Sequence, residues 1–251
     1  MFRPRVIPVL LLHKNGLVKT VKFGNNKYIG DPLNAVRIFN DLKVDEIVLL
    51  DIDATKEKRS ISIDLVKEIG EEANMPFSVG GGINDIDTIK KLTHAGAERV
   101  ILSSHAIENP DFVRQASEYF GSSTICVCID YKKRWVGKHK VYIRSGEKNS
   151  GKDIQALAIE MQNAGAGEVI IQSIDKDGSM TGYDLDMIKQ ISSSVTIPVI
   201  ALGGAGSISD MEQAYKTAYA NGVAAGSFFV FKGAHRGVLI QYPSITDYNF
   251  K

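Results

Sequence analysis

The sequence predicts a closed (βα)8 barrel, in which eight parallel strands alternate with helices. Short apolar runs alternate with segments of helical periodicity along all 251 residues, a length typical of such a barrel. The connections between them are short, and no linker divides the chain, so we expect one domain over residues 1–251. In addition, residues 76–83, an apolar run with three glycines near its end, have a counterpart at residues 198–206.

The chain repeats one plan in two halves. The offset of 122 residues from Pro76 to Pro198 also places Glu46 over Glu168 and Asp64 over Asp186. Each copy holds several strand and helix patterns, so the repeat is too long for a solenoid unit. We therefore predict an internal duplication, with half-barrels at about residues 1–122 and 123–251.

Each element has its own signal. Continuously apolar runs, typical of strands buried on both faces of a parallel sheet, occupy residues 6–12, 46–50, 76–80, 100–102, 124–130, 169–172, 198–202 and 223–227. N-cap residues followed by apolar positions at helical spacing predict helices over residues 31–42, 65–73, 84–95, 109–120, 153–164, 184–191 and 210–220. A small hairpin is predicted over residues 135–143, and beyond residue 231 the last helix is predicted to be short or broken.

Composition excludes several classes of protein. The formal charge of +1, without a charged tail, argues against nucleic acid or a membrane surface as a partner. The N-terminal apolar run is too short for a membrane span or a cleaved signal, so we expect a cytoplasmic protein. Cys126 and Cys128 are expected to be buried thiols, because a lone Cys-x-Cys is weak evidence for a metal. We predict neither a metal nor a cofactor.

Functional residues of such a barrel lie at the carboxyl ends of its strands. Two matched sets of residues are found there, namely Gly82 with Ser103 and Ser104, and Gly204 with Gly226 and Ser227. Free backbone N–H groups and hydroxyl donors at a helix start are what a phosphate group needs. Two such sets predict a bisphosphorylated ligand, to which we add the Asp177-Gly178 loop; the alternative is that the glycines only close the rim.

Asp130 ends the fifth strand at the same rim. An unpaired carboxylate there is a candidate general acid or base, and its alternative role is to cap a helix or turn. We favour catalysis for Asp130.

Four charged residues stand at the opposite end of the barrel. Arg5, Glu46, Arg99 and Glu168 occur at the starts of strands and alternate in sign. They would pair with one another, because burying unmatched charges is costly. Spacing alone leaves two roles open: a plug that stabilises the floor, and a gate for a small neutral molecule.

The chain resembles, along nearly its whole length, the cyclase subunit of imidazole glycerol phosphate synthase. The resemblance rests on residues 45–51, 76–83, 108–110, 173–178, 181–184 and 203–206. It implies that a glutaminase subunit docks on the amino-terminal face and that ammonia passes the ring of Arg5, Glu46, Arg99 and Glu168. It also implies that the mouth holds two phosphates. Arg99 stands where the family usually has lysine.

One departure from the family concerns catalysis. The family places its first catalytic aspartate at the end of strand one, where this chain has Leu11, and no Asp or Glu occurs before Asp31. Strand one and its loop then offer only His13 and Lys14 as titratable groups near the mouth, so Asp130 is left without its partner carboxylate. Ser103 also replaces the usual asparagine. This pattern resembles the divergent copies associated with bacterial surface-polysaccharide clusters.

Three hypotheses follow. The first is a barrel that binds a glutaminase and conducts its ammonia to a sugar amidotransferase, with little cyclase chemistry of its own. The second is an active histidine-pathway cyclase, a lyase-type enzyme, in which Asp130 works with a substitute such as His13. The third, a phosphosugar isomerase, would also need an acid–base residue on strand one, which Leu11 does not provide.

Overall fold

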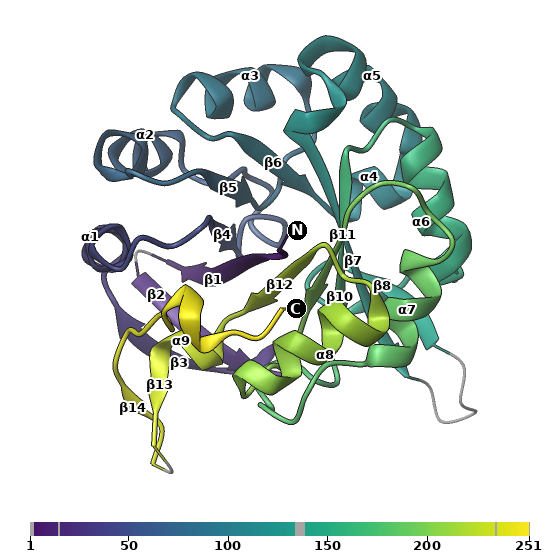
Figure 1. Cartoon of the computed structure of the whole chain (residues 1–251). Coiled ribbons are helices and arrows are strands. Elements are labelled where there is room, and N and C mark those ends of the chain that lie inside the picture. Colours follow the sequence, from purple (N-terminus) through teal and green to yellow (C-terminus); the bar gives the residue numbers. More distant parts are fainter. Residues whose placement is uncertain (1–2, 15, 134–138, 234, 251) are drawn as a thin grey trace.

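The computed structural model describes residues 3–14, 16–133, 139–233 and 235–250. At its centre eight parallel strands form a closed barrel, which confirms the predicted fold class (Figure 1). Around the barrel the strands are β1 (Arg5–His13), β4 (Ile47–Asp51), β5 (Phe77–Gly80), β6 (Arg99–Leu102), β7 (Ile125–Lys133), β10 (Glu168–Ser173), β11 (Val199–Leu202) and β12 (Gly222–Ala225). The last strand, β12, pairs with β1 and closes the ring.

Helices surround the barrel (Figure 1). They are α1 (Pro32–Asp41), α2 (Ile63–Glu72), α3 (Ile86–His94), α5 (Pro110–Phe120), α6 (Ile154–Asn163), α7 (Leu185–Ser192) and α8 (Ile208–Ala218). Asp31, Asp85 and Asp153 cap their helices by accepting backbone N–H groups at 2.9, 2.7 and 3.0 Å. Asn109 makes no such bond, so the start of α5 depends on Pro110 rather than on the predicted cap. Two short helices were not predicted, α4 (Ser104–Glu108) and α9 (Ser227–Val230).

Side chains alternate between the two faces of each strand, and this alternation decides which of them fill the interior of the barrel. On β1, Ile7, Val9 and Leu11 pack inside the barrel, whereas Leu10 and Leu12 belong to the core beneath the helices. The interior layer is completed by Val48, Ile101, Cys126, Cys128, Ile170, Ile200, Leu202 and Ala224, with Leu50 beside them. Both cysteines are buried, as predicted. The barrel centre is therefore apolar, with charged side chains at its floor and polar ones at its mouth.

Three hairpins extend the barrel on its carboxyl-terminal side. β2 (Gly16–Val21) and β3 (Gly24–Gly30) continue from β1, β8 (His139–Ile143) and β9 (Lys148–Asn149) continue from β7, and β13 (Phe231–Lys232) pairs with β14 (Gly237–Val238). The only predicted hairpin covered residues 135–143; residues 134–138 lie outside the described residues, and β8 pairs with the end of β7. The β2–β3 hairpin was missed because β3 is polar and mostly exposed, so it carries no apolar alternation.

The C-terminal segment takes the place of an eighth helix. A short or broken helix was predicted beyond residue 231, but the described part of residues 231–250 contains no α-helix and only a 3-10 turn at Ile245–Asp247. The Tyr242 hydroxyl donates to the carbonyl oxygen of Val6 at 3.0 Å and accepts from the N–H of Asp45 at 3.4 Å. The Phe250 ring packs against Tyr215 of α8. The segment thus covers β1 beside α8.

Among the described residues, no helix combines the length and the apolar character needed to cross a membrane.

Candidate functional site at the barrel mouth

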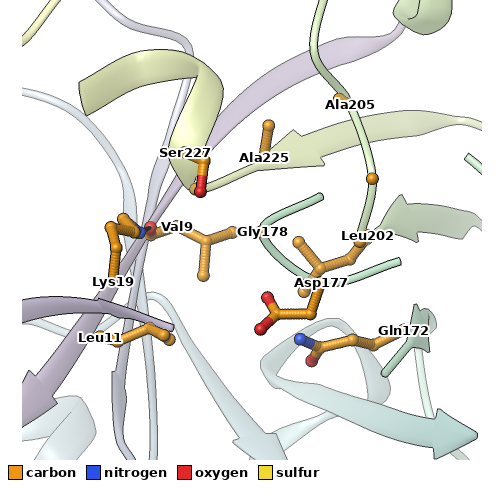
Figure 2. Close-up of a pocket in the computed structure, with 13 residues that line it drawn as sticks. Val9, Leu11, Lys19, Gln172, Asp177, Gly178, Leu202, Ala205, Ala225 and Ser227 are labelled. Carbon is orange, nitrogen blue, oxygen red and sulfur yellow. Dashed lines mark hydrogen bonds between the residues drawn. The ribbon is translucent and has the colours of Figure 1, made fainter. Parts of the chain in front are cut away.

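A pocket opens at the carboxyl ends of the strands (Figure 2). It is lined by Val9, Leu11, Lys19, Gln172, Asp177, Gly178, Leu202, Gly203, Gly204, Ala205, Ala225, Gly226 and Ser227. The second predicted phosphate set, the Asp177-Gly178 loop and Leu11 therefore face one cavity. Gly82, Ser103, Ser104 and Asp130 are not part of its lining.

Two glycines of this pocket pack closely against the chain, and the first of them must be glycine. A Cβ on Gly204, where φ is +116°, would lie 2.2 Å from the carbonyl oxygen of Gly182. A Cβ on Gly226 would lie 2.6 Å from Nζ of Lys19. Backbone packing therefore explains Gly204 without a ligand, whereas at Gly226 the neighbouring atom is the end of a flexible side chain that can shift.

Lys19, which sequence reasoning missed, brings a cation to this set. The side chain comes from β2, is only 4% exposed, and its Nζ donates to the carbonyl oxygen of Val9. Burial lowers the pKa of Lys19 to about 8, although the charge of Asp177 opposes this. The expectation that strand one and its loop bring only His13 and Lys14 to the mouth is therefore wrong. The sequence feature that could have identified Lys19 is its position inside the short strand-like run of residues 16–21.

The first predicted phosphate set is built differently. Gly82 has φ +64°, and a Cβ there would lie 1.8 Å from the carbonyl oxygen of Arg59, so its conformation is imposed by packing. Ser104 Oγ already accepts the N–H of Arg144 at 2.8 Å. Ser103 precedes α4 without a side-chain cap bond. The Ser104 hydroxyl thus already accepts a hydrogen bond from the chain itself, and its O–H can still act as a donor.

Asp130 lies within β7 with 8% of its surface exposed, because the strand, predicted to end at Asp130, continues to Lys133. Its Oδ1 is 3.5 Å from Sγ of Cys128, and that thiol is also 3.7 Å from Oε1 of Gln172. Burial raises the pKa of Asp130 to about 7. Within the described part of the chain no backbone N–H donates to this carboxyl group, which argues against the capping role. A carboxyl group with such a pKa can exchange a proton near neutral pH.

The neighbouring carboxylates are committed to the scaffold. Asp51 accepts the backbone N–H groups of Asp53 and Ala54, and it pairs with Arg59 at 2.5 Å. Asp53 Oδ2 lies 2.8 Å from Nδ1 of His13. His13 is therefore bound to Asp53 and does not line the pocket.

The four predicted floor residues meet in one ring. Arg5 contacts Glu46 at 2.5 Å and also pairs with Glu168, while Arg99 reaches Glu46 at 3.5 Å and Glu168 at 3.7 Å. Burial works against the charge on Arg5, but the attraction of Glu168 and Glu46 outweighs it and raises the pKa of Arg5. Both carboxylates are buried, so each depends on these partners.

No group of three or more His, Cys, Asp or Glu side chains within the described ranges could hold a metal ion.

Fold and site together define a (βα)8 barrel with a charged ring at its floor and a glycine-lined pocket at its mouth. Comparison with known proteins gives the family: the model of the histidine biosynthesis protein family matches residues 5–235. The chain belongs to this family and, within it, to the group of imidazole glycerol phosphate synthase subunit HisF.

Three relatives illustrate the similarity. A Leptospira borgpetersenii protein, provisionally named imidazole glycerol phosphate synthase subunit HisF, is 47% identical over 98% of both chains. A Pseudomonas aeruginosa protein, provisionally named subunit hisF2, is 42% identical over 98% of both chains. Imidazole glycerol phosphate synthase subunit HisF of Alkaliphilus metalliredigens is 39% identical over 91% of both chains.

Proposed function

We propose that this chain binds a glutaminase subunit, conducts its ammonia through the barrel, and delivers the ammonia to a separate enzyme rather than cyclising a substrate efficiently itself. The acceptor enzyme in this proposal is a sugar amidotransferase that converts an acetamido group of a surface-polysaccharide sugar into an acetamidino group. The glutaminase would dock on the amino-terminal face, below the ring of Arg5, Glu46, Arg99 and Glu168.

The observation that carries the proposal is the position of Leu11. Its side chain packs with the apolar interior and lines the mouth pocket, where the resemblance places the first catalytic aspartate. A leucine can neither accept nor donate a proton, and His13 is held by Asp53. Asp130 therefore lacks a partner carboxylate on β1, although Lys19 stands at the mouth and the ring at the floor is complete.

A second candidate function is an active cyclase of histidine biosynthesis. The buried Lys19 beside Gly226 favours it, because this cation would support binding of one phosphate of a bisphosphorylated ligand. Asp130, with its raised pKa, would then be the acid–base residue.

One experiment separates the two functions. Turnover of the open-chain bisphosphorylated ribulosyl substrate is measured with ammonium salt and this chain alone, beside a histidine-pathway cyclase as the positive control. We expect no turnover above background from this chain. Turnover that is abolished by Asp130→Asn would establish the cyclase and refute the proposal.

A further inference from the structure

We propose that the β2–β3 and β13–β14 hairpins together form the surface on which the ammonia-accepting protein docks. We call the exposed face of residues 21–28 and 231–239, without the undescribed residue 234, the hairpin surface. This inference rests on the proposed function, since it names where the acceptor binds.

The two hairpins form one continuous surface although they are far apart in sequence. Lys27 Nζ donates to the carbonyl oxygen of Arg236 at 3.1 Å and lies 4.9 Å from the centre of the Phe231 ring. In Figure 1, β3 and β13–β14 lie beside each other at the edge of the barrel.

The hairpin surface exposes apolar side chains. Val21, Tyr28, Val238 and Leu239 are four of the eight large hydrophobic side chains that are exposed in the described part of the chain. Tyr28 is 66% exposed and Leu239 is 51% exposed. Exposed apolar side chains beside charged ones are typical of protein contact sites, and tyrosine and arginine are favoured there.

The charges of this surface have one sign. Residues 21–28 contain Lys22 and Lys27 and no acidic residue, and residues 231–239 contain Lys232 and Arg236 and no acidic residue, whereas the whole chain carries only +1. The surface therefore fits a partner with an acidic rim. A second copy of this chain is a poor occupant, because its own hairpin surface would place like charges opposite each other.

The hairpin surface begins at the wall of the mouth pocket. Thr20 Oγ1 donates to Oδ2 of Asp177 at 2.7 Å, and the N–H of Lys22 donates to the carbonyl oxygen of Asp177 at 3.1 Å. A Cβ on Gly178 would lie 2.2 Å from the carbonyl oxygen of Thr20, so the two backbones touch. A protein seated on the hairpins would therefore have its own active site next to the opening through which ammonia leaves.

The test uses the complex of this chain with its glutaminase and, as the probe, the purified sugar amidotransferase encoded in the same genome. Lys22→Glu reverses an exposed charge, and Tyr28→Glu puts a charge in place of the most exposed apolar side chain of the hairpin surface. The matched controls are Lys67→Glu on α2 and Tyr28→Phe. Affinity is measured by biolayer interferometry at several salt concentrations.

We expect each of the two test variants to weaken amidotransferase binding at least tenfold, with glutaminase affinity unchanged and both controls like the unmodified chain. The affinity of the unmodified complex should fall as salt rises, because the contact includes opposite charges. Unchanged binding in both variants would overturn the proposal. So would gel filtration showing that the chain alone is a dimer which these variants dissociate.

Amidination assays separate a failure of this inference from a failure of the proposed function. If glutamine-dependent amidination requires the chain but is unaffected by Lys22→Glu and Tyr28→Glu, the docking surface is wrong and the proposed function stands. If amidination does not require the chain, and the chain cyclises the bisphosphorylated substrate, the proposed function is wrong as well.

Discussion

Arg5 Nη1 lies 2.5 Å from Oε2 of Glu46, so the first residue of β1 is joined to the residue that precedes β4. The other oxygen of Glu46 accepts the hydroxyl of Ser78 on β5 at 2.7 Å. One buried carboxylate therefore links three neighbouring strands at the barrel floor. The same ring that we propose as the ammonia entrance also holds the strands in register.

Arg5→Met is expected to destabilise the fold by about 3 kcal/mol, because Glu46 and Glu168 would stay buried without their closest cation. The free energy of unfolding from urea titrations measures this. Arg99→Met is the matched control, and it should cost less because its contacts with the two carboxylates are 3.5 and 3.7 Å long. Equal losses for both variants would show that the short contacts of Arg5 do not matter.

Asp130→Asn is expected to change how stability depends on pH. The native carboxyl group keeps its proton up to about pH 7, whereas an unfolded aspartate loses it near its ordinary pKa of 3.8. Between pH 3.8 and about pH 7 the folded state therefore binds more protons than the unfolded state. As the pH rises through this range, Asp130 lowers the free energy of unfolding by up to about 4 kcal/mol.

Urea unfolding of both proteins between pH 4.5 and 8 tests this, since other titrating groups cancel in the difference. Asp130→Asn should gain stability relative to the unmodified chain as the pH rises, and Asp64→Asn, at an exposed position on α2, should not. Parallel curves for Asp130→Asn and the unmodified chain would contradict the raised pKa.

Leu11→Asp is expected to create ammonia-dependent cyclisation that the unmodified chain lacks, since it puts a carboxyl group on β1 in the lining of the mouth pocket. The assay is turnover of the bisphosphorylated ribulosyl substrate with ammonium salt. Leu11→Asn has nearly the same shape without the titratable group and should stay inactive. If Leu11→Asp also stays inactive while folded, the missing carboxylate is not what separates this chain from an active cyclase.

Tyr242→Phe is expected to lower the free energy of unfolding by about 1–2 kcal/mol, because the carbonyl oxygen of Val6 and the N–H of Asp45 lose their shared hydroxyl partner. Thermal and urea unfolding measure the loss. Tyr119→Phe, at a side chain that is 63% exposed, should change stability by much less. A similar, small effect of both substitutions would mean that the C-terminal segment is not anchored through this hydroxyl.

Much of the site can be located from the sequence, because strand periodicity and the barrel rule act together. A period of two places Arg5 and Leu11 on the same side of β1, and parallel strands bring their carboxyl ends to one rim. That is why Gly204, Gly226 and Ser227 were predicted to meet and do so. The half-barrel duplication and the catalytic and phosphate-binding roles stay predictions.

The sequence by itself determined the barrel, its order of strands and the ring at its floor, since these follow from local apolar runs, caps and the alternation of side chains. Only the tertiary structure decided which groups reach the pocket. Lys19 enters the mouth because the polar β2–β3 hairpin folds back along β1, and His13 leaves it because Asp53 lies within hydrogen-bonding distance. Such contacts join residues on different elements, and their free energy depends on how deeply the residues are buried and how far apart they lie. A local sequence pattern contains neither quantity, so these contacts could not be predicted from it.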